Sequence, residues 1–237
     1  MKYLIFNHKA NLNYDDVIKQ IKALKPYQNK LIIAPSAIYL NMFKEAGFTV
    51  CSQDVSVKSN GNFTGEITAS QLSSLQVPYT LIGHYERQKY FKETIDDIKC
   101  KIKQALDNNL QIILCLGEQN KYELDSLYSF LKEIINLLPD NQKMILAYEP
   151  TYMISSQSIL DVDYINNVIQ DLKKILTNQQ VDIIYGGGVS VENFDLVKQI
   201  NVDGYLIGNC STKLDGILAL LKVFQHDSTK LDEHRHF

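Results

Sequence analysis

Short apolar runs alternate with longer amphipathic stretches along the chain, and the alternation occurs eight times. The runs are continuously apolar, which is typical of parallel strands that are buried on both faces. They predict strands at Tyr3–Asn7, Lys30–Ala34, Phe48–Ser52, Tyr79–Ile82, Gln111–Cys115, Lys143–Tyr148, Asp182–Tyr185 and Gly204–Ile207.

The stretches between these runs carry apolar residues at helical spacing. The clearest examples are Val17, Ile18, Ile21 and Leu24, then Ile98, Ile102, Ala105 and Leu106, and finally Ile165, Val168, Ile169, Leu172 and Leu176. Eight units in 237 residues average about 30 residues each, which is the length that one βα unit needs. The pattern therefore predicts an α/β protein, a single-domain (β/α)8 barrel over residues 1–224. A doubly wound open sheet is the alternative.

Residues 225–237 are polar and include three of the five histidines. They predict a flexible tail after the last helix rather than a metal site.

The charge balance and the cysteines limit the class of protein. Lys and Arg number 24 against 27 Asp and Glu, a net charge of −3, which gives no electrostatic reason to expect a nucleic-acid partner. No apolar run approaches the ~18 residues that span a bilayer, and the first residues do not have the pattern of a signal peptide. The four cysteines are dispersed without a CxxC pair. We expect a soluble cytoplasmic protein with no membrane partner.

Three chemically active side chains follow predicted strands. Lys9 comes after the first strand, His84 after the fourth and Glu149 after the sixth. In a parallel barrel the carboxyl ends of all strands meet at one rim, so these side chains converge. Glu149 is suited to be a general base, with His84 and Lys9 stabilising the oxygen of an enediolate.

Two glycine-containing turns follow the last two strands, Gly186-Gly187-Gly188 and Gly208-Asn209. Backbone N–H groups in such turns can surround a phosphate, because glycine permits a close approach. No His, Cys or carboxylate pair has the spacing of metal ligands. The constellation predicts proton transfer on a small phosphorylated carbonyl compound, without a metal.

Six motifs occur in one order along nearly the whole chain, and together they resemble the triosephosphate isomerase family. They are Asn7-His8-Lys9-Ala10-Asn11, Asn62-Phe63-Thr64-Gly65-Glu66, Gly83-His84-Tyr85-Glu86-Arg87, Cys115-Leu116-Gly117-Glu118, Ala147-Tyr148-Glu149-Pro150 and Tyr185-Gly186-Gly187. The resemblance implies a homodimeric enzyme of glycolysis and gluconeogenesis that needs no cofactor. Such an enzyme interconverts dihydroxyacetone phosphate and D-glyceraldehyde 3-phosphate.

The resemblance also implies a role for each matching residue. Glu149 would move the proton between two substrate carbons, and neutral His84 would polarise the carbonyl group. Lys9 would supply positive charge, with Asn7 beside it. Glu86 would lie next to Lys9 and Cys115 near the base, both as supporting residues. Thr64 would reach the partner subunit of the dimer. Substrate binding is expected of Ser155, Gly187, Gly188, Gly208 and Asn209.

The departures from the family pattern lie at the phosphate end. The lid segment 151–157 contains no glycine, Gly188 replaces a usual serine, and Asn209 replaces a second glycine, where its tolerance of positive φ would preserve the turn. A lid contact is expected for Tyr185. Glu86 and Arg87 admit a structural interpretation as an ion pair bracing the loop after the fourth strand.

Two alternative functions follow from these departures. One is an isomerase of a related phosphorylated ketose, such as a four-carbon one. The other is a barrel without catalytic activity, which the three retained side chains disfavour.

Overall fold

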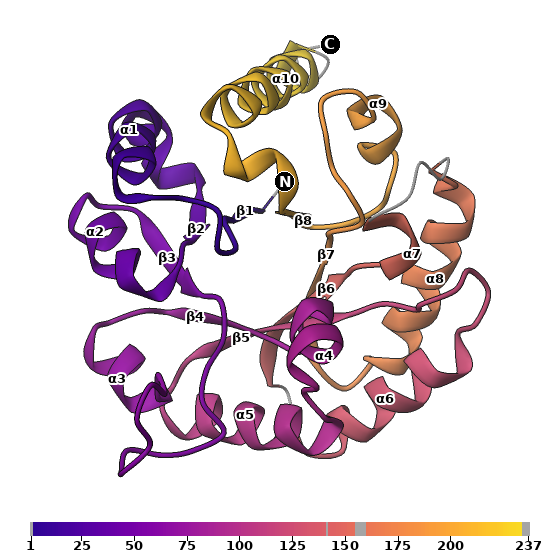
Figure 1. The fold of residues 1–237 in the computed structure, drawn as a ribbon. Helices are drawn as coiled ribbons and strands as arrows, with labels where there is room; N and C mark the ends of the chain where they lie inside the picture. Colours follow the sequence, from indigo (N-terminus) through magenta and orange to yellow (C-terminus); the bar gives the residue numbers. More distant parts are fainter. Residues whose placement is uncertain (1, 141, 155–159, 234–237) are drawn as a thin grey trace.

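The computed structural model describes residues 2–140, 142–154 and 160–233, and the side chains of residues 2–140, 142–153 and 160–224. Eight parallel strands follow one another around a closed barrel, and the helices lie outside them (Figure 1). The last strand pairs with the first, with Tyr3 opposite Gly204. This pairing confirms the barrel and excludes the open sheet.

The strands lie within one or two residues of the predicted ranges. They are β1 Tyr3–Asn7, β2 Ile32–Ala34, β3 Thr49–Ser52, β4 Tyr79–Ile82, β5 Gln111–Leu116, β6 Lys143–Tyr148, β7 Gln180–Tyr185 and β8 Gly204–Ile207.

The helices cover the outside of the barrel and part of its rim. The α-helices are α1 Tyr14–Leu24, α2 Leu40–Glu45, α3 Ala69–Ser74, α4 Tyr85–Phe91, α5 Ile95–Asp107, α6 Asp125–Ile135, α7 Thr151–Ile154, α8 Val162–Ile175, α9 Phe194–Val197 and α10 Leu214–Glu233. Short 3-10 helices are η1 Lys25–Lys30, η2 Ala37–Tyr39 and η3 Asn209–Thr212. No helix in the described ranges is both long and apolar enough to span a bilayer.

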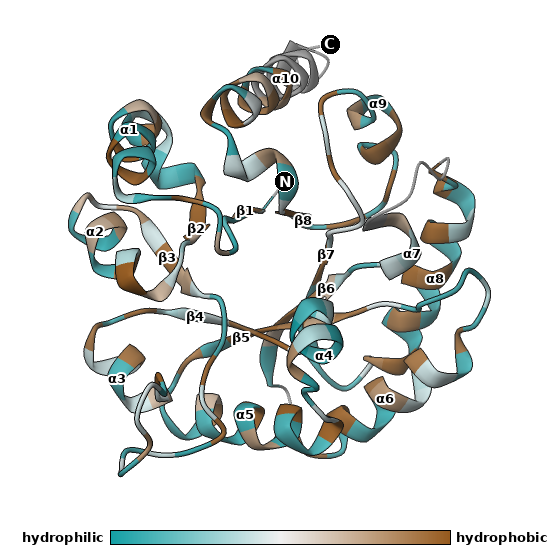
Figure 2. Ribbon diagram, viewed as in Figure 1, coloured by the Kyte–Doolittle hydropathy of each residue, from teal (hydrophilic) through white to brown (hydrophobic). Residues whose placement is uncertain are grey.

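Alternate strand residues point to two separate cores. Ile5, Ile113 and Ile145 belong to the group that fills the barrel, whereas Leu4 and Phe6 belong to the layer between strands and helices. This is why the strands are apolar without a break. Figure 2 shows the same division, with the hydrophobic positions concentrated on the strands and on helix faces turned towards them.

The predicted helix faces are confirmed with one correction. All five apolar residues predicted for α8 are buried. In α1, however, Ile18 is 45% exposed and Gln20 is buried instead. The Gln20 amide donates to the Ser211 carbonyl oxygen at 3.3 Å, so its burial leaves that donor satisfied.

The final helix, α10, continues to Glu233. The boundary predicted at residue 225 therefore falls inside this helix.

Candidate active site

Lys9, His84 and Glu149 meet at the carboxyl ends of β1, β4 and β6. All three line one cavity of about 200 Å³. The other side of this cavity is formed by residues that follow β7 and β8, namely Gly186, Gly188, Val189, Ser190, Gly208, Asn209 and Cys210. The predicted convergence of side chains and glycine turns is thus present in the structure.

Hydrogen bonds hold both the backbone N–H and the carbonyl oxygen of Lys9. Its φ is +51°, a left-handed conformation that costs a non-glycine residue about 1–2 kcal/mol. Its N–H donates to Asn7 Oδ1 at 3.1 Å, and its carbonyl oxygen accepts from Ser36 Oγ and Gln53 Nε2 at 3.0 and 2.9 Å. These bonds offset the strain and fix where the side chain leaves the backbone.

The Lys9 ammonium group forms an ion pair with Glu86, with 2.7 Å between Nζ and Oε1. This agrees with the predicted neighbourhood of Glu86 and Lys9. The structure does not show the Glu86–Arg87 ion pair. Arg87 pairs with Asp54 at 3.0 Å, and the two successive residues of α4 thus serve different clusters.

His84 is the N-cap of α4, and its ring orientation is set by the helix itself. The ring Nδ1 accepts a hydrogen bond from the backbone N–H of Glu86 at 3.3 Å. An acceptor nitrogen carries no proton, so the neutral ring holds its proton on Nε2. Nε2 points towards Glu149, with 3.7 Å between Nε2 and Oε2. The side chain therefore presents an N–H donor to the cavity.

Glu149 is a buried carboxylate, 5% exposed, with little to satisfy it. Its Oε2 has no hydrogen-bond partner among the described residues. Burial raises the pKa of Glu149, while a hydrogen bond from Cys115 and the positive charge of Lys9 oppose that rise. A raised pKa makes the carboxylate a stronger base. Cys115 itself is buried, and burial raises its thiol pKa, so it supports Glu149 rather than acting as a nucleophile.

Two glycines allow the backbone to approach Glu149 closely. A Cβ on Gly117 would lie 1.9 Å from the Glu149 carbonyl oxygen, and a Cβ on Gly186 would lie 2.7 Å from the Glu149 Cγ and Oε1 atoms. No side chain fits at either distance. Gly186 therefore fixes the position of the base, although it belongs to the turn predicted to bind phosphate.

The turn after β7 has unpaired backbone N–H groups, and one of its residues with such a group, Val189, lines the cavity. Within the described residues, the amide groups of Gly187 and Val189 donate to no protein acceptor. Gly188 has φ +83°, the region that favours glycine, and its carbonyl oxygen accepts from Asn193 Nδ2 at 2.8 Å. Unpaired N–H groups around a turn are suited to bind an anion. In the described ranges, no cluster of three or more His, Cys, Asp or Glu is arranged to hold a metal ion.

Comparison with known proteins decides the family. The family model described as triosephosphate isomerase matches residues 2–224. The chain belongs to the triosephosphate isomerase family. It is 34% identical to the triosephosphate isomerase of Orientia tsutsugamushi over 94% of this chain and 97% of that one. It is 31% identical to that of Aspergillus oryzae, with 87% and 92% covered, and 32% identical to that of Dictyostelium discoideum, with 91% and 93% covered.

The other predicted residues of this triosephosphate isomerase family member fall in three places. Gly208 and Asn209 line the cavity. Gly187 is not among its described lining residues, and its carbonyl oxygen accepts from the Tyr185 hydroxyl at 3.0 Å. Tyr185 is therefore held within its own turn. Ser155 lies outside the described residues. Thr64 is exposed on the segment between β3 and α3.

Asn209 is not in the conformation expected for it. The positive-φ residues of the chain do not include Asn209, which instead begins η3 after Gly208 at φ −93°. A second glycine is unnecessary here because the backbone does not enter the left-handed region.

Sequence reasoning did not assign a role to Tyr85, Ser36 or Ser211. Tyr85 lines the cavity, and Ser211 Oγ donates to the carbonyl oxygens of Asn7 and Gly208, which joins the ends of β1 and β8. Tyr85 directly follows the candidate His84, and this adjacency is the signal that could have pointed to it. The two serines carry no comparable signal.

Proposed function

We propose that this protein interconverts dihydroxyacetone phosphate and D-glyceraldehyde 3-phosphate through an enediolate, a step of glycolysis and gluconeogenesis. One observation carries the proposal. A buried carboxylate, an imidazole N–H and an ammonium group surround a cavity of about 200 Å³, opposite a turn with unpaired backbone N–H groups. Membership of the triosephosphate isomerase family supports it.

In the proposed reaction Glu149 removes a proton from the substrate carbon next to the carbonyl group. The electron pair of that C–H bond forms the carbon–carbon double bond of the enediolate, and the carbonyl oxygen takes the negative charge. A proton passes from the neighbouring hydroxyl oxygen to the former carbonyl oxygen, with His84 at the cavity wall to carry it. Glu149 then returns its proton to the former carbonyl carbon, and the carbonyl group has moved by one position. The raised pKa of Glu149, caused by its burial, favours this proton removal.

His84 and Lys9 stabilise the charge that develops on the oxygens. His84 donates from Nε2, and because Nδ1 is occupied by the Glu86 N–H, the ring needs no reorientation. Lys9 adds a fixed positive charge at the same rim, and its ion pair with Glu86 keeps the side chain in place. The phosphate group binds at the turns after β7 and β8, where backbone N–H groups and the Lys9 charge attract a dianion.

The proposal is tested by measuring kcat and KM of the purified protein for D-glyceraldehyde 3-phosphate and for unphosphorylated D-glyceraldehyde. We expect kcat/KM to be at least about a thousandfold higher for the phosphorylated compound, because its binding to the turns is used in the transition state. A folded protein that fails to convert the phosphorylated compound would refute the proposed function.

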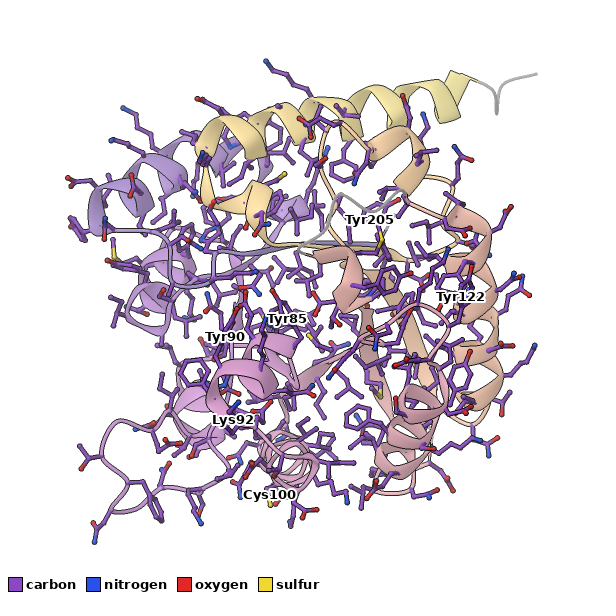
Figure 3. All side chains as sticks on the ribbon, turned by 45° about the vertical axis from the view of Figure 1, so that its right-hand side comes forward. Tyr85, Tyr90, Lys92, Cys100, Tyr122 and Tyr205 are labelled. Atoms are coloured by element: carbon purple, nitrogen blue, oxygen red, sulfur yellow. The ribbon has the colours of Figure 1, made fainter. Side chains whose placement is uncertain are left out.

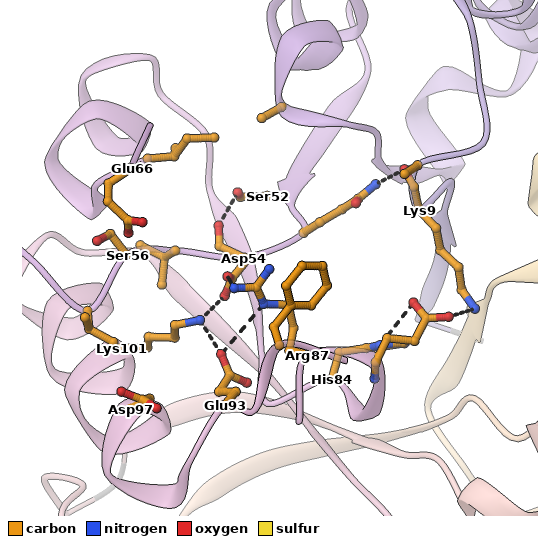
Figure 4. A pocket seen from close by; sticks show the side chains of 18 of the residues that line it. Lys9, Ser52, Asp54, Ser56, Glu66, His84, Arg87, Glu93, Asp97 and Lys101 are labelled. Atoms are coloured by element: carbon orange, nitrogen blue, oxygen red, sulfur yellow. Dashed lines mark hydrogen bonds and ion pairs between the residues drawn. The ribbon is translucent and has the colours of Figure 1, made fainter. Parts of the chain in front are cut away.

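We also propose a homodimer, in which Thr64 of one subunit approaches Asn7 and Lys9 of the other. The segment between β3 and α3 extends away from the barrel at the lower left of Figure 1. A second cavity, of about 560 Å³, opens beside Lys9 and Glu86 (Figure 4). Its size and position suit the entry of such a segment from a second copy. Light scattering after size exclusion should give twice the monomer mass, and a stable monomer at micromolar concentration would contradict this.

We propose a cytoplasmic location because the cysteines form no disulfide bond. All four are free, including exposed Cys100, as expected in a reducing compartment.

A further inference from the structure

The substrate cavity has a larger neighbour. A cavity of about 590 Å³ lies between the ends of β4 and β5, with Gly83 and Gly117 in its wall and Lys89 and Lys92 among its lining residues. Only two described residues, Tyr85 and Glu149, line both this cavity and the 200 Å³ substrate cavity. These two side chains are therefore the partition between the spaces. Glu149 is the proposed base, whereas Tyr85, the other residue of the partition, has no function assigned so far.

The aromatic ring of Tyr85 is held against the reacting groups. Its centroid lies 5.1 Å from that of the His84 ring and 5.9 Å from Lys9 Nζ. Its hydroxyl group is 3.5 Å from Glu86 Oε1, the same oxygen that accepts from Lys9. The ring thus packs on the Lys9–Glu86 pair while it faces the substrate cavity.

The charges around the Tyr85 hydroxyl agree with this position. Its pKa is raised to about 12, first by burial and then by the carboxylates of Glu86 and Glu149 and by Tyr90. The burial of the ring and the two negative charges disfavour loss of the hydroxyl proton. The hydroxyl stays protonated at neutral pH and adds no charge to the site.

We propose that Tyr85 is a specificity-determining residue, whose ring closes the substrate cavity on the β4–β5 side and restricts it to three-carbon phosphates. This inference rests on the proposed function and extends it to the substrate length. When the phosphate is held at the turns, the aldehyde end of a chain one carbon longer lies one position further from them, and the ring leaves no space there. With the ring removed, the two cavities join and the aldehyde end of the longer chain enters the larger space.

The α4 helix offers a matched control. Tyr90 lies five residues further along α4, is 62% exposed, and is not among the described residues lining either cavity. Figure 3 shows Tyr85 nearer the centre of the molecule and Tyr90 nearer its edge. Tyr90→Ser therefore makes the same chemical change outside the partition.

The experiment compares wild type, Tyr85→Ser, Tyr85→Phe and Tyr90→Ser. Each protein is assayed for kcat/KM with D-glyceraldehyde 3-phosphate and with D-erythrose 4-phosphate, a four-carbon aldose phosphate. The measured quantity is the ratio of the two values. One carbon in a tight pocket commonly changes this ratio by about 10- to 200-fold. We expect the three-carbon preference to fall at least about tenfold in Tyr85→Ser and to stay within about twofold in the other two variants.

An unchanged ratio in folded Tyr85→Ser would overturn the inference, as would an equal fall in Tyr90→Ser. Binding of D-erythrose 4-phosphate, measured by its effect on thermal melting, supplies a second readout that needs no turnover. It should strengthen in Tyr85→Ser alone, and equal binding to all four proteins would also overturn the inference. Lack of wild-type turnover of D-glyceraldehyde 3-phosphate would count against the proposed function, while the binding comparison would still test the partition.

Discussion

The two sides of the substrate cavity are built in different ways. On the proposed proton-transfer side, the cavity is lined by the side chains of Lys9, His84 and Glu149, which are held by neighbours such as Glu86 and Cys115. On the proposed phosphate side, the turns after β7 and β8 bring glycines and unpaired backbone N–H groups to the cavity, beside uncharged side chains such as Ser190 and Asn209. The departures that the sequence resemblance implies for Gly188 and Asn209 lie on this second side, where backbone groups tolerate a change of side chain as long as φ and ψ are preserved.

The first way to test this contrast removes a charge from the proton-transfer side. Lys9→Met should lower kcat/KM by about a thousandfold, since it removes the cation facing the substrate and leaves Glu86 unpaired, a loss of about 4 kcal/mol. Steady-state kinetics measure the effect. Lys173→Met, at an exposed lysine of α8, is the control and should leave the kinetics unchanged. A less than tenfold loss in Lys9→Met would contradict the proposed role.

A second change tests whether Gly186, in the turn after β7, positions the base Glu149 rather than the phosphate. Gly186→Ala places a Cβ 2.7 Å from Glu149 Cγ, so the base must move. A displacement of about 1 Å costs about a hundredfold in rate. We expect kcat to fall by that factor while KM changes little. A rise in KM with kcat preserved would show that Gly186 serves the phosphate instead.

A third prediction concerns His8, which precedes Lys9 in the buried core. Neither ring nitrogen has a hydrogen-bond partner among the described residues, and burial lowers the pKa of His8 from 6.5 to about 3. Between these values the unfolded chain binds a proton that the folded protein does not. The free energy of unfolding therefore has its full value above pH 6.5 and decreases as the pH drops, by about 2 kcal/mol at pH 5.

Urea unfolding at pH 8 and pH 5 measures this effect, with His8→Phe for comparison. Phenylalanine suits the site, because the His8 ring already packs on Phe43 with 5.4 Å between centroids. From pH 8 to pH 5, the free energy of unfolding of the variant should decrease by about 2 kcal/mol less than that of wild type. Parallel losses in both proteins would exclude His8 as the cause.

The smallest expected effect lies on the phosphate side. Gly188→Ala meets open space except for the Met153 carbonyl oxygen at 3.5 Å, so the change acts through the backbone. At φ +83° an alanine is strained by about 1–2 kcal/mol, which shifts the turn. We expect KM to rise about tenfold with kcat nearly unchanged, the opposite of Gly186→Ala. Equal effects of the two substitutions would remove the distinction between the two sides.

The fold was predictable because parallel strands buried on both faces must be continuously apolar, and eight such runs leave few arrangements. Lys9, His84 and Glu149 were predictable because strand ends share one rim. Ile18 was assigned wrongly because helical spacing ignores polar partners. Gln20 is buried in its place through a bond to Ser211, 191 residues away in sequence.

Backbone conformation explains the remaining differences at the site. The positive φ of Gly188 and its absence at Asn209 depend on the local path of the chain, which residue types alone do not determine.

The Glu86–Arg87 pair was a reasonable expectation for adjacent opposite charges. On a helix, however, successive side chains point in different directions, and Arg87 meets Asp54 instead. The place of Tyr85 between two cavities could not be predicted, because it depends on spaces that only the folded chain encloses.

The central claim is that Glu149 moves the proton, and Glu149→Gln tests it most directly. The substitution keeps the shape of the side chain and removes its basicity. Wild type and variant are compared by kcat and KM for D-glyceraldehyde 3-phosphate, with Glu45→Gln, an exposed carboxylate of α2, as the control. We predict that kcat falls by about 10²–10⁴-fold in Glu149→Gln while KM stays within a few-fold and Glu45→Gln resembles wild type. A Glu149→Gln protein that retains wild-type kcat would contradict the account.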